Sequence, residues 1–426
     1  MRTISLCCVL VACGGSSGPA TPVPPTISSV NPTSGVWGTQ LTITGTNFGV
    51  TQGTNRVVAG SVGANGFVVD TWTDTQITGR IAFPATDSIG VTNLGGTAMT
   101  TFTTTMPWTP SDAVDVADLA QEIVLSTGDV GALYNEFELT PEPTLAAFTG
   151  TAKGAYPIAS LVDSADPTAP IAAAVVEGDD HTPELIATKP DNSVSAFTIS
   201  GGTLAETPTM LPAGNVIAAA RDATGLYAWI ETETGMILAR EGSPWTAGSA
   251  IATPITPVAG GAIGSDNMLW IVGTDASDYA SIATIAQAGS AFSAAEHVGS
   301  AMFTDGIATA SIQIASDNVH AFVTATSAGS DAPLALERTA AATWSAPATL
   351  AGVVAYAFFG STLGAVTNDS SSAKTTALVP DITNASSAQA IDVWPALSAG
   401  LAVDASGVAH PIVNNGNVAY SLTSSM

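Results

Sequence analysis

From residue 108 onwards the sequence repeats with a period of about 48 residues. Aromatic residues, most of them followed by Ser or Thr, recur at intervals of 40 to 52 residues. They are Trp108, Phe148, Phe197, Trp245, Phe292, Trp344 and Trp394. A period of this length, with several short strands in each unit, is typical of the blades of a β-propeller. The sequence therefore predicts an all-β ring of repeated sheets.

Five of the repeats also contain a short turn signal between two apolar strands. The turn signals are Asp222 to Gly225, Asp266-Asn267, Asp317-Asn318, Gly360-Ser361 and Asp404 to Gly407. Such pairs mark β-hairpins. The strands before three of these turns, at 217–220, 307–310 and 400–403, consist largely of small residues, which fit the crowded centre of a ring. The recurring aromatic residues come near the end of each unit, so we expect them on outer strands that pack against the next blade.

The two ends of the repeat array complement each other. After Trp394 only about 30 residues remain, enough for three strands. Trp108-Thr109 precedes the first full unit without strands of its own. We therefore expect the strand near residue 108 to supply the outer strand of the last blade, which closes the ring and removes an exposed edge. Residues 106–426 are assigned to this propeller, and the seven aromatic positions predict seven blades within a range of six to eight.

One repeat resembles a known group of propellers. Residues 342–352, ATWSAPATLAG, resemble BNR-like bacterial propellers of unassigned function. The chain lacks the S-x-D-x-G-x-T-W box of sialidases, which argues against that activity. A sialidase also needs clustered arginines to hold a substrate carboxylate. Here Arg240, Arg338 and Lys189 belong to different blades, and we expect them in solvated turns at the blade periphery.

Residues 26–105 form a separate segment. Residues 38–45 alternate apolar and polar side chains, as a half-buried strand does, between turns at 32–35 and 46–49. The run PTISSVNPTSGVWGTQLTITGTNFG over 25–49 resembles an IPT/TIG domain. The resemblance continues at Trp72, Ile77, Pro84, Asn93, Gly95, Gly96 and Phe102. It implies an immunoglobulin-like β-sandwich that acts as a spacer or an adhesive module and carries no catalytic residue.

The first residues are typical of an export signal. Arg2 precedes a short apolar run, residues 4–12, which is too short to span a bilayer. The run ends in Leu-Val-Ala before Cys13, which resembles a lipobox. The resemblance implies that residues 1–12 are removed and that Cys13 is acylated, with residues 13–25 as a flexible Gly/Ser/Pro tether. We therefore expect an exported outer membrane lipoprotein that partners the membrane through this anchor, on the periplasmic face or the cell surface.

The charge of the chain is strongly negative. It has 35 acidic and 9 basic residues, a net charge of −26. Residues 25–105 contain three Asp and two Arg, a net charge of −1, so the acidity belongs to the propeller. Such a surface repels nucleic acids and anionic glycans and favours neutral or basic partners.

No motif for catalysis or for a cofactor occurs, so the sequence predicts no catalytic residue and no cofactor. Candidate metal ligands are Asp179, Asp180 and Glu184 in the run EGDDHTPE. Hard cations such as calcium take several oxygen ligands. The alternative is a solvated acidic loop, which we favour.

Aromatic and histidine residues give the candidate ligand-binding positions. Tyr227, Trp229 and Trp270 offer flat rings for a ligand, although burial between blades is the favoured alternative. His320 and His410 fall on the strands after two of the Asp turns and could face a common cavity. The alternative is that each is a structural histidine of its own blade.

Three functions fit these features. The favoured one is an anchored, non-catalytic binding or adhesion scaffold for a neutral glycan or a protein. The second is a carbohydrate-active hydrolase or lyase with its acid and base on propeller loops, and the third is a passive structural component of the envelope. Carboxylates that converge with a base in an axial pocket would favour the enzyme. Shallow aromatic pockets between blades would favour a lectin-like protein.

Overall fold

A computed structural model describes most of the chain after residue 21. The described residues are 22–35, 39–59, 67–81, 88–104, 108–110, 114–115, 118–135, 143–148, 155–162, 171–200, 202–327, 334–347, 353–368, 376–384, 388–390, 398–404, 406–414 and 418–424. The predicted signal sequence, residues 1–12, and Cys13 lie outside them. The chain divides into two compact units between residues 105 and 106. None of the helices in these ranges has the length and the apolar character needed to cross a membrane.

The first unit is a β-sandwich. One sheet has the order β1 (Thr26–Asn31), β3 (Gln40–Thr46), β6 (Gln76–Ile81) and β5 (Phe67–Trp72). The other contains β4 (Arg56–Ala59), β7 (Ser88–Asn93) and β8 (Gly96–Thr101), and the short strands β2 (Ser34–Gly35) and β9 (Thr103–Thr104) pair in parallel. Alternate residues of β3, among them Leu41 and Ile43, are fully buried, as the sequence predicts. They pack against Ile89 and Val91 of the opposite sheet, so the two sheets share one core.

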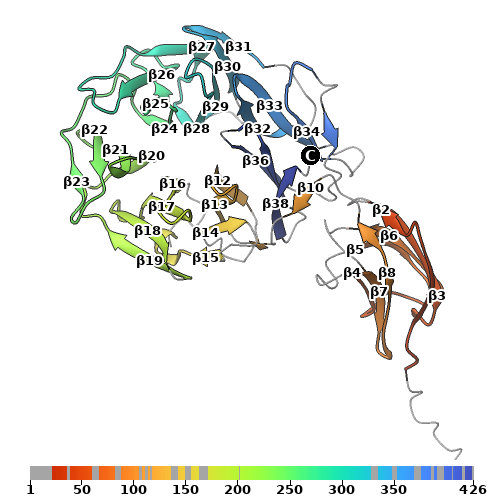
Figure 1. The fold of residues 1–426 in the computed structure, drawn as a ribbon. Coiled ribbons are helices and arrows are strands. Elements are labelled where there is room, and N and C mark those ends of the chain that lie inside the picture. The colour runs from red at the N-terminus through yellow and green to blue at the C-terminus, as the bar shows by residue number, and fades with distance from the viewer. Residues whose placement is uncertain are drawn as a thin grey trace, which may run out of the picture. The chain divides into compact units, whose positions relative to one another are not determined.

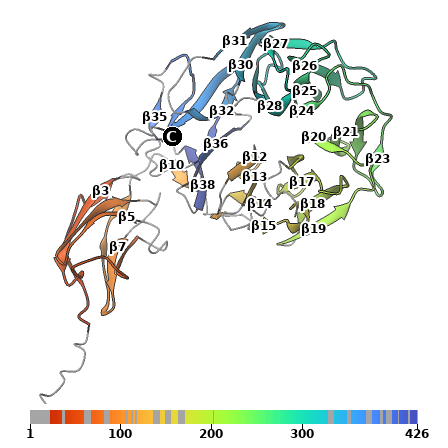
Figure 2. The ribbon, with the colours of Figure 1, turned by 180° about the vertical axis from the view of Figure 1, so that it is seen from behind.

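The second unit is a propeller of seven sheets in the described residues, and its blades follow one another in chain order around a ring (Figures 1 and 2). The first strand of each blade is β12 (Asp118–Val124), β16 (Ala173–Glu177), β20 (Asn215–Asp222), β24 (Val258–Ile263), β28 (Ile307–Ile314), β32 (Val353–Phe359) or β36 (Ser398–Val403). The second is β13 (Val130–Asn135), β17 (Pro183–Thr188), β21 (Gly225–Thr232), β25 (Met268–Thr274), β29 (Ala321–Ser327), β33 (Thr362–Asn368) or β37 (Ala409–Asn414). The all-β class with an immunoglobulin-like sandwich and a propeller is thereby confirmed.

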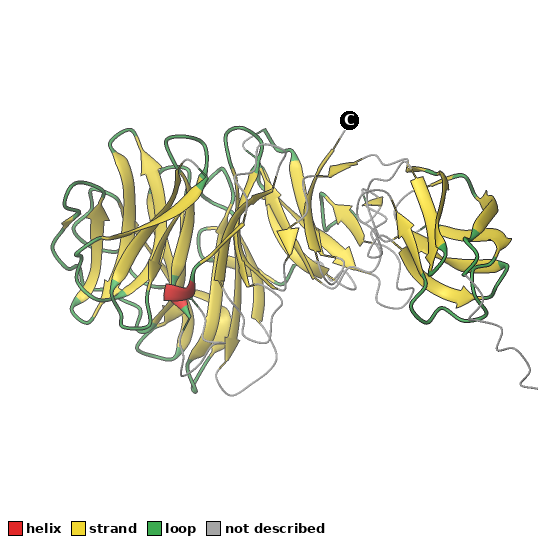
Figure 3. Cartoon of the chain, turned by 90° about the horizontal axis from the view of Figure 1, so that it is seen from below, coloured by secondary structure: helices red, strands yellow, loops and turns green. Residues whose placement is uncertain are grey.

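The outer half of each blade is less regular. The third strands are β14 (Pro143–Phe148), β18 (Val194–Ser200), β22 (Gly235–Arg240), β26 (Tyr279–Ala286), β30 (Leu334–Ala340), β34 (Thr376–Val379) and β38 (Val418–Ser424). The outermost are β15 (Ala155–Pro157), β19 (Thr203–Pro208), β23 (Thr246–Ala247), β27 (Glu296–Met302), β31 (Thr343–Ser345), β35 (Gln389–Ala390) and β10 (Trp108–Pro110). Within the ranges described, the helical structure is limited to η3 (Ala159–Leu161), drawn in red in Figure 3.

The last blade takes its outermost strand from the beginning of the unit. Strand β10 pairs antiparallel with β38, with Trp108 opposite Ser424 and Pro110 opposite Leu422. The short strand β11 (Val114–Asp115) pairs with the same β38. The first strands of consecutive blades contact each other all the way round, β12 with β36 included. The ring is therefore joined both at its inner strands and through the outer edge of blade 7.

The hairpin turns between first and second strands are confirmed. Asp222 and Gly225 form the closing pair of the β20–β21 hairpin, and Phe359 and Thr362 close the turn at Gly360-Ser361. Each Asp of the four Asp turns accepts a hydrogen bond from the backbone N–H two residues later. The left-handed positions are taken by Gly225, Asn267, Asn318 and Gly407, residue types that tolerate a positive φ. These aspartates therefore stabilise their own turns.

The recurring aromatic residues do not all lie on outer strands. Trp344 lies on β31, and Trp245 comes just before β23. Phe197, however, lies on the third strand β18, where it is buried in a cluster with Leu133 and Leu185 from blades 1 and 2. The expectation of an outer strand is wrong for Phe148 on the third strand β14 and for Phe197, which fills the gap between blades 1 and 2 from one strand further in. Trp394 lies outside the described residues.

We predict that the β10–β38 pairing holds the ring closed. Replacing Trp108→Gly, Thr109→Ser and Pro110→Gly together should lower the free energy of unfolding by about 2–4 kcal/mol, because blade 7 then exposes an unpaired edge. Urea unfolding followed by circular dichroism measures this change. The control replaces Thr246→Gly and Ala247→Gly in β23, an outer strand that closes nothing. An equal loss of stability in both variants would contradict the special role of β10.

Candidate functional site

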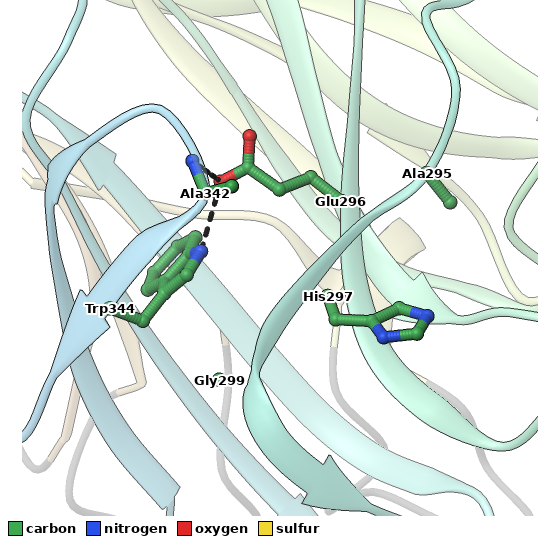
Figure 4. Close-up of a pocket in the computed structure, with 6 residues that line it drawn as sticks. All are labelled: Ala295, Glu296, His297, Gly299, Ala342 and Trp344. Carbon is green, nitrogen blue, oxygen red and sulfur yellow. Dashed lines mark hydrogen bonds between the residues drawn. The ribbon is translucent and has the colours of Figure 1, made fainter.

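A pocket of about 600 Å³ lies between the outer strands of blades 4 and 5. Its walls are formed by Ala295, Glu296, His297 and Gly299 from β27 and the loop before it, and by Ala342 and Trp344 at β31 (Figure 4). Strands β27 and β31 contact each other, so both walls belong to one packed interface. The sequence analysis did not single out Glu296, His297, Gly299 or Ala342.

Two backbone irregularities shape this pocket. Ser281 pairs with His297 while Tyr279 pairs with Met302, so residues 298–301 bulge out of the β26–β27 ladder. Gly299 in this bulge has a φ of +63°, and a Cβ there would come within 2.9 Å of Leu336. Ala342 in the β30–β31 turn also has a positive φ, 54°. The bulge and the turn place a backbone N–H and an indole beside the carboxylate of Glu296.

Four hydrogen bonds hold the Glu296 carboxylate. It accepts bonds from Arg338 Nε (2.8 Å) and Nη2 (2.9 Å), from Trp344 Nε1 (2.9 Å) and from the Ala342 backbone N–H (3.1 Å). In Figure 4 Glu296 points toward Ala342 and Trp344. Burial favours the neutral acid, but the hydrogen bonds and charge of Arg338 outweigh it and hold the pKa of Glu296 below its usual value. Glu296 is therefore a fixed anion and is unsuited to donate a proton near neutral pH.

Arg338 joins the two blades below the pocket. Its side chain is about 10% exposed and also donates to the Val319 carbonyl at 2.7 Å. Its guanidinium lies 5.2 Å from the ring centroid of Trp270 in blade 4. A bidentate ion pair with a cation–π contact compensates the desolvation of both charges.

His297 forms the other polar part of the pocket. Its Nε2 lies 2.8 Å from Asp275 Oδ2, and its ring stacks on Tyr279 with centroids 4.3 Å apart. Burial raises the pKa of Asp275, but hydrogen bonds from Ser277, Tyr279 and other groups including His297 lower it by more than burial raises it. Asp275 therefore stays ionised. The His297 side chain is 48% exposed and points away from Trp344. The pocket thus offers two ring surfaces, the indole of Trp344 with its Nε1 bonded to Glu296 and the imidazole of His297 with its Nε2 bonded to Asp275.

The corresponding position of blade 3 is built differently. Arg240 occupies the place of Arg338, but it pairs with Thr246 where Arg338 pairs with Trp344, and Trp245 comes one residue before that position. Arg240 lies over the ring of Tyr227 at 5.4 Å and bonds to Asp222 Oδ2 (3.1 Å) in its own blade. The pairing of an arginine with an acid of the preceding blade is therefore not repeated there.

The expected placement of the basic residues is partly wrong. Arg240 and Arg338 lie on third strands, where aromatic and carboxylate neighbours compensate their burial, and not in solvated turns. Lys189 does lie in a turn, after β17, and pairs with Glu206 at 3.1 Å.

The acidic run at 177–184 surrounds an arginine. Arg221 of blade 3 bonds to Asp179 Oδ1 (2.8 Å) and to Glu184 Oε2 (2.6 Å) of blade 2. Asp180 accepts hydrogen bonds from the hydroxyl and backbone N–H of Thr182. Burial raises the pKa of Glu184, and Arg221 only partly offsets this. Asp179 and Glu184 thus hold a guanidinium, and the described part of the chain contains no group of three or more His, Cys, Asp or Glu arranged for a metal.

A serine, a histidine and a glutamate meet between blades 1 and 2. His181 Nδ1 lies 2.8 Å from both Ser126 Oγ and Glu177 Oε1, and Ser126 donates to Glu177 from its hydroxyl (2.5 Å) and its backbone N–H (3.0 Å). In a catalytic triad the two ring nitrogens of the histidine face the nucleophile and the acid separately. Here one nitrogen faces both. The group therefore has the geometry of a link between blades and lacks that of a nucleophile relay.

The aromatic candidates are buried. Tyr227 and Trp229 are fully buried and Trp270 is 4% exposed, all of them in clusters with residues of a neighbouring blade. They are not exposed platforms, because strands β21 and β25 are covered on both faces. His320 Nδ1 pairs with Asp317 (2.6 Å), and the buried His410 lies 3.6 Å from Asp404. Each histidine thus lies beside the Asp of its own turn.

The fold and these contacts define a seven-bladed propeller with ion pairs between neighbouring blades. In the sequence it follows an immunoglobulin-like module. Residues 25–103 match the model of the IPT/TIG domain, so this part of the chain is an IPT/TIG domain, as the resemblance predicts. No curated protein matches the chain.

Several solved structures are similar to nearly the whole chain or to its propeller. An auxiliary nutrient binding protein from Bacteroides thetaiotaomicron is 12% identical, with a TM-score of 0.39 over 93% of this chain and 97% of that one. A virginiamycin B lyase from Staphylococcus aureus is 14% identical, with a TM-score of 0.34 over 87% and 98%. YCF48 bound to D1 peptide is 11% identical, with a TM-score of 0.46 over 75% and 96%. At these values the similarities carry no argument about function, which depends on the residues of this chain.

We predict that Glu296 stabilises the propeller in its ionised form. Glu296→Gln should lower the free energy of unfolding by about 2–4 kcal/mol at pH 7, because Arg338 loses a charged partner. The folded pKa of Glu296 is lowered, so this contribution is present above the ordinary pKa of about 4.3 and is lost as the pH falls through the folded value. Urea unfolding from pH 7 to pH 3 should show the difference between parent and variant shrink below about pH 4. A difference that stays constant down to pH 3 would contradict the assignment.

Proposed function

We propose that this chain is an exported, lipid-anchored binding protein whose propeller holds a neutral glycan, without transforming it, in the pocket between blades 4 and 5. One observation carries this proposal. The pocket combines aromatic walls, Trp344 and His297, with a carboxylate whose hydrogen-bonding capacity is taken up by the protein itself.

Aromatic side chains with fixed polar edges suit a sugar ring. The apolar face of a sugar packs on an indole or imidazole, while its hydroxyl groups bond at the rim. Trp344 is held by its bond to Glu296, and His297 by Asp275 and Tyr279. Side chains fixed in this way lose little conformational freedom on binding, which favours affinity.

The charge of the site selects against anions. Glu296 and Asp275 stay ionised, and the chain as a whole carries a net charge of −26. Arg338, the cation nearest to Glu296, makes hydrogen bonds to Glu296 and Val319. Sulfated or carboxylated sugars would therefore meet repulsion without a free arginine to receive them.

Catalysis would require a different arrangement. Glycoside cleavage uses two carboxyl groups, one of which acts as an acid with a raised pKa. In this pocket the pKa of Glu296 is lowered, and all four of its hydrogen bonds come from the protein. These features support a binding role over the alternative of a hydrolase or lyase.

We predict that Trp344 carries the sugar contact. Trp344→Ala should weaken the binding of neutral oligosaccharides about tenfold or more, because the stacking surface is lost. Trp344→Phe should keep most of the affinity, since it retains a ring and loses only the bond to Glu296. A glycan array followed by titration calorimetry measures this.

The control is Trp245→Ala, which removes the tryptophan near the outermost strand of blade 3, outside the pocket. Circular dichroism melting verifies that both alanine variants remain folded. Equal losses at Trp245 and Trp344 would refute the pocket. Hydrolysis or elimination of any glycan on a panel of glycosidase, lyase and esterase substrates, if abolished by Glu296→Gln, would establish the enzyme instead.

The lipid anchor has its own test. Cys13→Ser should abolish incorporation of a labelled fatty acid and leave the signal sequence uncleaved by the lipoprotein peptidase, because the acylated sulfur is missing. Metabolic labelling of the expressing cells measures this, with Cys8→Ser as the control that keeps the lipobox cysteine. Equal labelling of parent and Cys13→Ser would disprove the anchor.

A further inference from the structure

Three loops at one end of the IPT/TIG domain are tied to each other by asparagine side chains. Asn93 Nδ2 donates to the Val23 carbonyl (3.0 Å) and to the Asn47 carbonyl (2.7 Å). Asn47 Nδ2 donates to the Pro24 carbonyl (3.3 Å). The segment that enters the domain, the loop after β3 and the β7–β8 turn therefore form one connected end of the sandwich.

This end presents aliphatic side chains to the solvent. Val23 is 60% exposed, Val50 83% and Leu94 81%. We call these three residues the apolar tip. Leu94 sits in a turn that Asn93 Oδ1 fixes by accepting bonds from the N–H groups of Gly95 and Gly96. Single exposed aliphatic residues are ordinary, but three on connected, hydrogen-bonded loops mark a contact surface.

The apolar tip also has few charges around it in a strongly acidic chain, and one of them, the exposed Arg56 that pairs with Thr92, is a cation. The sequence has no charged residue from Gly14 to Asn55 or from Ser88 to Thr105. Asp74, which lies at the same end, accepts a hydrogen bond from the Gly49 N–H at 2.9 Å. With a net charge of −26, most of the protein is repelled by an anionic membrane surface. The apolar tip is a surface that can approach one.

The position of Cys13 brings this end to the membrane. Ten residues separate Cys13 from Val23, a reach of at most about 35 Å. Val23 belongs to the apolar tip itself, so the chain enters the domain at this end. An acylated Cys13 would therefore hold the apolar tip closer to the bilayer than the opposite end of the sandwich, where β1 meets β2.

From these observations we infer that Val23, Val50 and Leu94 insert into the lipid interface and act as a second membrane contact beside the acylated Cys13. The inference rests on the proposed anchor. Acyl chains fix one point of the protein to the membrane, and shallow insertion of aliphatic side chains adds a second point. The domain would then stand on the membrane in a defined orientation, with its opposite end directed away from it.

The test places a fluorescent label at each end of the domain in the full acylated chain. Once Cys7 and Cys8 leave with the signal and Cys13 is acylated, an introduced cysteine is the sole thiol. Leu94→Cys labels the apolar tip, and Thr33→Cys labels an exposed position at the opposite end. Both carry an environment-sensitive label and are bound to vesicles of phosphatidylethanolamine and phosphatidylglycerol that contain brominated phosphatidylcholine.

We expect a blue shift and quenching of the label at position 94 and neither change at position 33. Adding Val23→Ser and Val50→Ser to Leu94→Cys should abolish the shift while vesicle flotation and the melting temperature stay unchanged. If the protein floats with the vesicles but the labels at positions 94 and 33 give identical signals, the membrane contact of the apolar tip is refuted and the lipid anchor is not. Loss of flotation in every variant would refute the anchor and this contact with it. Protection of position 94 that depends on protein concentration and not on lipid would assign the apolar tip to a second copy of the chain and overturn the inference.

Discussion

The closed ring of sheets is the constraint on which the rest of the propeller depends. A blade of four short strands has two apolar faces and can bury them only against its neighbours, as the clusters shared by blades 3 and 4 and by blades 4 and 5 show. A row of blades leaves an apolar face exposed at each end unless its first and last blades pack together. Here the first and last blades are joined by the contact of β12 with β36 at the inner strands and by the pairing of β10 with β38 at the outer edge. The pocket is a consequence of the same arrangement, because it exists only where β27 and β31 of adjacent blades are held together.

Ion pairs join the blades where the apolar contacts end. Arg221 reaches from blade 3 to Glu184 of blade 2, and Arg338 reaches from blade 5 to Glu296 of blade 4. Each arginine is mostly buried and bonded to more than one oxygen, which a planar guanidinium does better than a lysine. The propeller has only six basic residues against 32 acidic ones, and two of its three arginines, Arg221 and Arg338, lie in the interfaces between blades. This distribution of charge is one reason for proposing a neutral ligand.

Sequence reasoning predicted the features that are determined by residues close together in the chain. The period, the Asp turns and the IPT/TIG segment depend on residues a few positions apart, and the structure shows them where they were expected. The pocket depends on Glu296, Arg338 and Trp344, which meet only through the bulge at residues 298–301 and the packing of two blades, and no spacing in the sequence encodes that. The favoured alternative for Tyr227, Trp229 and Trp270, burial between blades, is confirmed. Strands β21 and β25 are buried on both faces, so an apolar–polar alternation could not show where Tyr227, Trp229 and Trp270 point.

The polar clusters of the described residues share one property that separates binding from catalysis. Ser126, His181 and Glu177 bond to one another, Arg221 is enclosed by carboxylates, and Glu296 receives four protein donors. A catalytic group needs an unshared proton or lone pair aimed at the substrate, with a pKa near the working pH. In the pocket the groups left facing outward are the ring of His297, whose Nε2 is bonded to Asp275, and the indole of Trp344, whose Nε1 is bonded to Glu296. Surfaces of this kind can hold a ligand by shape and stacking, and their fixed geometry keeps the cost of ordering low. The hydrogen bonds within these three clusters therefore support the proposed binding role over a catalytic one.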